Sequence, residues 1–162
     1  TENGPVRGGK GNTITHGNHV PMVASWPKKI KEPSFYDHLI NFTDFYATFC
    51  DILGLANESD GLSMMDVLSG EKLLERETVT TYYDPIWSQN VSQFRNVFSQ
   101  NSRYKLYKNG KFFDMENDIL EKQPLNDNEL SEEQKNIKVK LAAELATFPS
   151  LPKTSLVKEQ NK

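Results

Sequence analysis

The sequence predicts an α/β segment followed by an α+β subdomain, in which about four antiparallel strands pack against one C-terminal helix. Three changes of pattern support this. Apolar residues recur at helical spacing over residues 43–54, the period shortens toward two over residues 78–113, and helical spacing returns over residues 131–148. We place the boundary near residue 72, so that residues 1–72 belong to the first part and residues 73–162 to the second.

The first elements are predicted to be a loop and a buried strand. In residues 4–17, Lys10 stands among Gly8, Gly9, Gly11 and Gly17, a composition that favours tight turns over helix or sheet. Residues 20–26 form a short apolar run with little alternation, which is typical of a strand buried on both faces of a parallel sheet. Pro27 ends this run. We therefore expect Lys10 to lie near the beginning of a buried strand.

A helix is predicted over residues 43–54. Thr43 or Asp44 can cap its start, and Gly54 suits the left-handed position after its end. Its apolar face comprises Phe45, Phe49 and Leu53, widened by Tyr46, Cys50 and Ile52. We expect this face to be buried, with Cys50 as a core residue.

An antiparallel meander is predicted in the second part. Strands are expected over residues 78–84, 94–99 and 104–107, because Thr, Val and aromatic residues are frequent there. The pair Asn109-Gly110 indicates a two-residue hairpin turn of type I′.

The last predicted element is a helix that packs on the meander. Ser131 and Gln134 have the spacing of a capping box at its start. Its apolar face consists of Ile137, Leu141, Leu145 and Phe148.

Composition and charge exclude several classes of protein. The 162 residues carry a formal net charge of −3 with both signs interspersed, which argues against a nucleic-acid partner. No run of about 18 apolar residues is present that could span a membrane. Cys50 is the single cysteine, so an internal disulfide is excluded. Because the chain opens at Thr1 in a glycine-rich loop, we interpret it as a piece of a longer protein.

Five segments carry a resemblance to a known family. They are Gly-Gly-Lys-Gly within residues 5–13, Val-Pro to Trp-Pro in 19–27, the helix of 42–54, Asp-Gly-Leu-Ser to Leu-Ser-Gly-Glu in 60–71, and Tyr-Lys-Leu-Tyr to Glu-Asn-Asp with Glu121 in 104–121. In this order they resemble the C-terminal portion of the sulfatases, arylsulfatase-like enzymes of the alkaline-phosphatase-like superfamily. The resemblance covers about residues 5–145. It implies the end of an alkaline-phosphatase-like domain, followed by the family's C-terminal subdomain.

The resemblance implies a role for Lys10, because a lysine in this glycine loop of sulfatases contacts the sulfate of the substrate. Cleavage of a sulfate ester loads charge onto the leaving oxygen, and a fixed cation stabilises that charge more in the transition state than in the ground state. His16 and His19 stand where the segment departs from the commonest family form, and they are candidate substrate-binding residues at the rim of the pocket. The alternatives are a solvated loop lysine and histidines with a structural role.

The remaining machinery is expected upstream of this chain. Sulfatases use a formylglycine made within a Cys/Ser-x-Pro-x-Arg motif, and Cys50 lacks the Pro and the Arg of that motif. The family's calcium ligands are also expected upstream, since the segment Glu2-Asn3-Gly4 is better interpreted as a plain turn. No metal ligand is assigned here, and the chain alone is predicted to be inactive. The implied partners are an aryl or carbohydrate sulfate ester and the missing N-terminal part, in a periplasmic or secreted enzyme.

Two other functions remain open. One is a phosphoester hydrolase or phosphotransferase of the same superfamily, which would have a lone Thr or Ser nucleophile upstream. The other is a non-catalytic relative that binds sulfated glycans without turnover.

Overall fold

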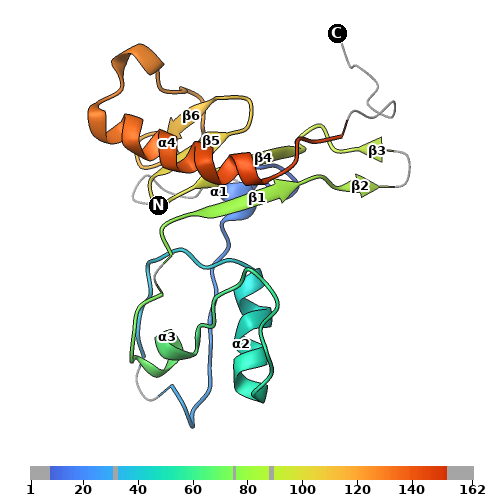
Figure 1. Cartoon of the computed structure of the whole chain (residues 1–162), viewed down its shortest axis with the longest axis vertical. Helices are drawn as coiled ribbons and strands as arrows, with labels where there is room; N and C mark the ends of the chain where they lie inside the picture. Colours follow the sequence, from blue (N-terminus) through green and yellow to red (C-terminus); the bar gives the residue numbers. More distant parts are fainter. Residues whose placement is uncertain (1–7, 31–32, 75, 88–89, 153–162) are drawn as a thin grey trace. The chain divides into compact units, whose positions relative to one another are not determined.

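The chain forms two compact units, which are described separately (Figure 1). The computed structural model describes residues 8–30, 33–74, 76–87 and 90–152, without the side chains of residues 86–91. Unit 1 consists of Thr1–Val20 with Thr80–Lys162, and unit 2 of Pro21–Val79. The glycine-rich loop thus belongs to the same unit as the C-terminal sheet. A domain boundary at residue 72 of the parent protein stays a prediction.

Unit 1 is built on the predicted meander. Its four-stranded sheet has the order β1-β4-β5-β6, and the pairs β4–β5 and β5–β6 are antiparallel. The strands are β1 (Val79–Tyr83), β4 (Asn96–Gln100), β5 (Tyr104–Tyr107) and β6 (Phe112–Asp114). Between β1 and β4 the chain makes a two-stranded antiparallel ribbon of β2 (Ile86–Trp87) and β3 (Asn90–Val91). The sheet and its C-terminal helix confirm the predicted subdomain.

The hairpin between β5 and β6 is confirmed, but its predicted turn type is wrong. Leu106 lies opposite Phe112, and the Tyr107 amide donates to the Lys111 carbonyl at 2.9 Å, which leaves a three-residue loop. Gly110 has φ 89°, whereas Asn109 has no positive φ. A type I′ turn needs positive φ at both central residues, so this is the longer hairpin loop with a left-handed glycine at its end.

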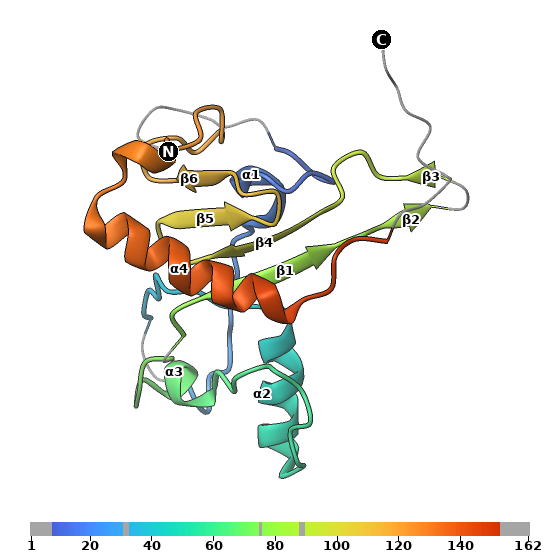
Figure 2. The same ribbon diagram turned by 45° about the horizontal axis from the view of Figure 1, so that its top comes forward.

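Helix α4 (Glu132–Thr147) covers one face of the sheet (Figure 2). The capping box is present as predicted, with the Ser131 hydroxyl accepting from the Gln134 amide at 3.2 Å. A short 3₁₀ helix, η1 (Asp127–Glu129), precedes it. The core under α4 contains Val97, Tyr104, Leu106, Phe112, Leu130, Leu141 and Leu145, with Ile137 and Phe148 packed against it. The predicted apolar face of this helix is confirmed.

The opposite face of the sheet carries a different set of residues, because successive side chains of a strand alternate between faces. Phe98, Tyr107 and Phe113 form a second buried cluster there, next to the buried Lys105. Thr13 and Glu121 contact this face by accepting hydrogen bonds from Lys105 and Tyr107. All four residues of β5 are therefore buried.

Unit 2 contains α2 (Thr43–Leu53) and α3 (Met65–Ser69). Gly54 and Gly70 end these helices with φ 66° and 76°, and the predicted stop at Gly54 is confirmed. The predicted cap at Thr43 or Asp44 is wrong, since the N-cap residue is Phe42 and no side chain caps it. Asp44 instead joins segments of the unit.

The Asp44 carboxylate is fully buried and holds unit 2 together. It accepts from the amides of Asn41 at 2.7 Å and Leu62 at 2.9 Å, and it is paired with Arg76. Gly61 allows this close approach, because a Cβ there would lie 2.1 Å from the Thr43 carbonyl oxygen.

Two predictions in unit 2 are wrong. Residues 20–26 form no strand, and Val23 is 94% exposed. A strand buried on both faces needs neighbouring strands, and no segment of the described chain pairs with this run. On α2, Ala47 and Thr48 are buried whereas Phe49 and Leu53 are exposed, because the helix packs within unit 2 through its small residues. Cys50 is buried, as predicted.

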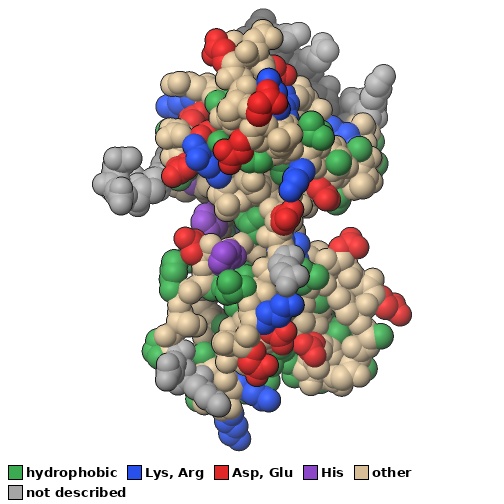
Figure 3. All heavy atoms as spheres, turned by 60° about the vertical axis from the view of Figure 1, so that its left-hand side comes forward, with side chains coloured by type: hydrophobic (Ala, Val, Ile, Leu, Met, Phe, Trp, Pro, Cys, Tyr) green, Lys and Arg blue, Asp and Glu red, His purple; other side chains and the backbone are tan. Residues whose placement is uncertain are grey.

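Charges of both signs are mixed on the described surface. Figure 3 shows acidic and basic side chains interspersed on the face that it draws. None of the helices in the described ranges is long and apolar enough to cross a membrane.

Candidate functional site

Lys10 lies in a tight turn formed by residues 9–12, which we call the Lys10 turn. The Asn12 amide donates to the Gly9 carbonyl at 3.0 Å, and Gly11 has φ 90°. A four-residue turn with positive φ at its third residue is of type II, which places glycine there and Lys10 at the second position. The Lys10 side chain is exposed. The predicted loop is therefore an ordered turn.

A short helix, α1 (Thr15–Asn18), closes the loop behind the Lys10 turn. The Gly9 amide donates to the His16 carbonyl at 3.1 Å. A Cβ at Gly17 would lie 2.6 Å from the carbonyl oxygens of both Gly9 and Asn12. Only glycine permits this approach of helix to turn, which accounts for Gly17, as the positive φ of the turn accounts for Gly11.

The loop is attached to the sheet by three buried side chains, Lys105, Tyr107 and Glu121, which we call the brace. The Lys105 ammonium donates to the Thr13 carbonyl and, at 3.0 Å, to the Glu121 carboxylate. The Tyr107 hydroxyl donates to the same carboxylate and lies 3.0 Å from the Thr13 carbonyl oxygen. The ion pair is closed to solvent, with side chains 0% and 1% exposed.

The brace also binds the start of α1. The Thr15 amide donates to Glu121 at 2.8 Å, and the Thr15 hydroxyl donates to it at 3.2 Å. A further bond lies at the Lys10 turn itself, where the Tyr83 hydroxyl donates to the Gly11 carbonyl at 3.2 Å. Glu121 has φ 53°, and it is the one non-glycine residue of the described chain with positive φ. A left-handed conformation is unfavourable for a residue with a Cβ, so its surroundings must hold it there.

Burial shifts the pKa values inside the brace. Desolvation lowers the pKa of Lys105 to about 8, although the nearby Glu121 carboxylate acts in the opposite direction. Burial and the hydrogen bond to Glu121 raise the pKa of Tyr107 well above its usual range. The Lys105 ammonium also lies 4.0 Å from the centre of the Phe98 ring, which gives the cation a favourable neighbour.

The structure brings two of the three predicted site residues together. Lys10 and His16 lie in one closed loop, where the His16 carbonyl binds the residue before Lys10. The Nδ1 atom of His16 is buried and has no hydrogen-bond partner. His19 follows α1 and is exposed. Lys10 does not lie at a strand end, because residues 20–26 form no strand. Whether these residues contact sulfate stays a prediction.

The described residues do not fit a calcium site. They contain no group of three or more His, Cys, Asp or Glu side chains that could hold a metal ion. The segment Glu2-Asn3-Gly4 lies outside the described residues.

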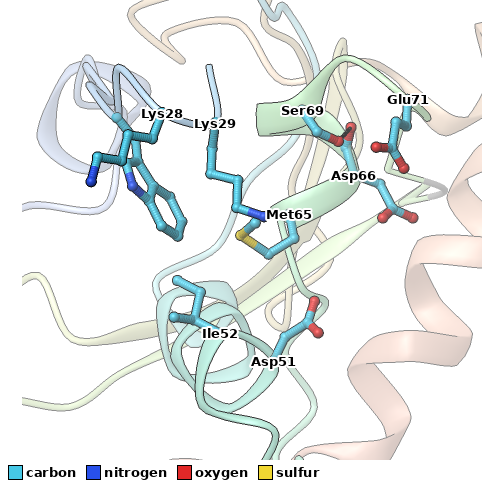
Figure 4. Close-up of a pocket in the computed structure, with 9 residues that line it drawn as sticks. Lys28, Lys29, Asp51, Ile52, Met65, Asp66, Ser69 and Glu71 are labelled. Carbon is cyan, nitrogen blue, oxygen red and sulfur yellow. Dashed lines mark hydrogen bonds between the residues drawn. The ribbon is translucent and has the colours of Figure 1, made fainter. Parts of the chain in front are cut away.

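A hollow in unit 2 has a volume of about 580 Å³ (Figure 4). Its lining has both signs of charge, with Lys28 and Lys29 on one side and Asp51, Asp66 and Glu71 on the other. Such a lining does not concentrate positive charge for an anion, so the Lys10 turn is the better candidate site.

The brace was not predicted from the sequence as a set of contacts. Lys105 stands between aromatic and aliphatic residues of a strand, and this lone charge in an apolar strand was the available signal. Its partners lie far away in sequence, 92 residues for Thr13 and 16 residues for Glu121. Local patterns do not report such pairings.

Comparison with known proteins shows the family of the chain. Residues 13–148 match the model of "N-sulphoglucosamine sulphohydrolase, C-terminal". This range includes the brace and begins three residues after Lys10.

Two curated relatives are sulfatases by name. The chain is 34% identical over 98 residues to the Ulvan-active sulfatase of Formosa agariphila, with 57% of this chain and 19% of that protein covered. It is 35% identical over 74 residues to the Uncharacterized sulfatase YdeN of Escherichia coli, with 43% and 13% covered. The chain thus spans less than one fifth of the length of either relative.

One similar solved structure is that of BT4656 in complex with its substrate D-glucosamine-2-N,6-O-disulfate. It has a TM-score of 0.49 and 22% identity, and the match covers 64% of this chain and 23% of that one. Because the family model spans most of the 162 residues, the chain belongs to the N-sulphoglucosamine sulphohydrolase C-terminal family and is a C-terminal portion of a sulfatase.

Proposed function

We propose that the protein containing this chain hydrolyses sulfate esters and that Lys10 binds the sulfate group of the substrate. Family membership supports the reaction class. The role of Lys10 is supported by one observation, namely its position at the corner of a glycine-rich turn that is hydrogen-bonded to the sheet on which it lies.

The ammonium of Lys10 is available to a ligand. Its side chain is exposed and makes no hydrogen bond or ion pair with the described part of the chain. By contrast, the ammonium groups of Lys105 and Lys108 are bound to protein oxygens. A cation that is fixed through its backbone and unpaired at its tip suits a site in which negative charge develops during the reaction.

The substrate class that we propose is a carbohydrate sulfate. The family model is named for an N-sulphoglucosamine sulphohydrolase, and one relative is named as ulvan-active. In this proposal His16 and His19 contribute to the sugar-facing rim beside Lys10. The formylglycine and the calcium are supplied by residues outside this chain, and residues 1–162 alone do not turn over substrate.

The test is the variant Lys10→Met in the full-length protein, with Lys111→Met as the matched control. Lys111 is also exposed and follows directly after the β5–β6 turn in the same unit. We expect kcat/KM on a sulfated monosaccharide to fall by about 10²–10³ for K10M, as for the loss of one charge-stabilising contact. K111M should leave it unchanged. Equal activity of K10M and the wild type would refute the role of Lys10.

A further inference from the structure

We propose that Lys105, Tyr107 and Glu121 are positioning residues of the sulfate-binding site, which hold the Lys10 turn in place without contacting the substrate. This inference rests on the proposed function of Lys10. It assigns a role to three side chains that follow Lys10 by about 95–111 residues in the sequence.

The brace acts on the main chain of the loop. It binds the Thr13 carbonyl through Lys105 and Tyr107, and it binds the Thr15 amide through Glu121. Bonds to backbone atoms determine where a segment lies regardless of its side chains. Thr13 follows Lys10 by three residues, so a shift at Thr13 is passed directly to the turn.

The turn's own bonds determine its shape but not its position. The bonds from Asn12 to Gly9 and from Gly9 to His16 lie within the loop. Within the described chain its hydrogen bonds toward the sheet are the Tyr83 bond, the brace, and a 3.3 Å contact from the Thr15 hydroxyl to the sulfur of Met115, which follows β6. Without the brace the loop could keep its turn, and Lys10 would then be presented at a different place.

The chemistry of the brace suits a positioning role better than a purely stabilising one. An ion pair closed to solvent loses most of its attraction to desolvation, and apolar residues of the same size often give equal stability. Glu121 is in addition held in a left-handed conformation. Unfavourable features of this kind are concentrated at functional sites, where geometry matters more than stability.

The experiment uses the full-length protein with Glu121→Gln and the matched control Asp114→Asn. Glutamine keeps the size of the side chain but removes the ion pair with Lys105, and its amide nitrogen cannot accept from Tyr107. Asp114 is also buried and is paired with Arg103 in the same hairpin. In the described chain its side-chain hydrogen bonds involve residues 103, 116 and 117 and do not reach the loop.

We expect E121Q to lower kcat/KM by about 10- to 100-fold, since a displacement of 1 Å can cost about 100-fold in rate. D114N should change it by less than about 3-fold, although it lowers the thermal unfolding midpoint. In a K10M background E121Q should cause no further loss, because the two residues act through one contact. A purely structural role would not produce this non-additivity.

Each outcome is informative. If K10M lowers activity and E121Q does not, the positioning role is wrong while the proposed function stands. Losses that add fully in the double variant also overturn the inference. If K10M has no effect, the proposed function fails and the inference with it. Should E121Q not fold, Tyr107→Phe replaces it, because this variant keeps the ring against Phe98 and Phe113 and removes only the hydroxyl bonds.

Discussion

The buried Lys105 should give the free energy of unfolding a specific pH dependence. Its folded-state pKa is lowered from 10.5 to about 8, chiefly by burial. Below pH 8 it is protonated in both the folded and the unfolded chain, so the desolvation cost is present in full. Between pH 8 and 10.5 the unfolded chain keeps a proton that the folded chain has released, and stability should therefore rise with pH.

The size of the effect follows from the shift. One pKa unit corresponds to 1.36 kcal/mol, so the difference between 10.5 and about 8 is worth roughly 3 kcal/mol at most. The Lys105 side chain is 0% exposed, so solvent does not screen the interaction. Glu121 and Tyr107 are the titratable groups that face it.

The assay is equilibrium unfolding by urea across this pH range for the wild type and Lys105→Met. Other lysines and tyrosines titrate in both proteins, so the difference between the two curves reports Lys105. We expect the wild type to gain stability relative to K105M as pH rises. The control Lys138→Met removes a peripheral lysine paired with Asp127 and should leave the rise intact. A difference that falls with pH would refute the reasoning, because it would mean that attraction to Glu121 exceeds the cost of burial.

Three further predictions concern the loop and α4. Gly17→Ala should lower both kcat/KM and the thermal unfolding midpoint, because its Cβ would meet two carbonyl oxygens at 2.6 Å. The control Gly8→Ala should be neutral in both assays, because a Cβ there has nothing within 4 Å. Leu141→Ala should lower the free energy of unfolding in urea by about 2–5 kcal/mol, because the Leu141 side chain is 0% exposed. Val139 on the same helix is 68% exposed, and an equal loss for Val139→Ala would contradict the described core. Ser131→Ala should cost about 1 kcal/mol in the same assay through loss of the capping box, and a cost near zero would show that the cap is not formed.

Elements with strong local signals could be predicted from the sequence. The Ser131 capping box, the α4 face and the β5–β6 hairpin depend on spacings of a few residues, and the structure contains all three. The turn type was missed because Asn109-Gly110 fits both a two-residue and a three-residue loop. The choice between them depends on strand register, which is a pairing between segments.

Burial in unit 2 was predicted less well for a physical reason. Hydrophobic residues show which side chains favour burial, but they do not show what covers them. Val23 in the run of residues 20–26 and Phe49 of α2 are apolar, yet they are 94% and 58% exposed in the described chain. Small residues such as Ala47 and Gly61 make the close contacts instead, and their pattern carries little periodic signal.

The site was predicted in part. The glycines around Lys10 indicated a tight turn, and the structure contains one. The brace was missed, since no local pattern connects Thr13 with Lys105. The contact of Lys10, His16 and His19 with sulfate stays a prediction.

The bond between Thr15 and Glu121 joins residues 106 positions apart, and this has a consequence for biosynthesis. Ribosomes add about 5–20 residues per second, so the Lys10 turn emerges roughly 5–20 s before its carboxylate partner has been made. During that interval the nascent loop lacks the anchor that fixes its position. A message with a premature stop codon at position 121 would thus encode the whole lysine loop without the carboxylate that binds Thr15, Lys105 and Tyr107.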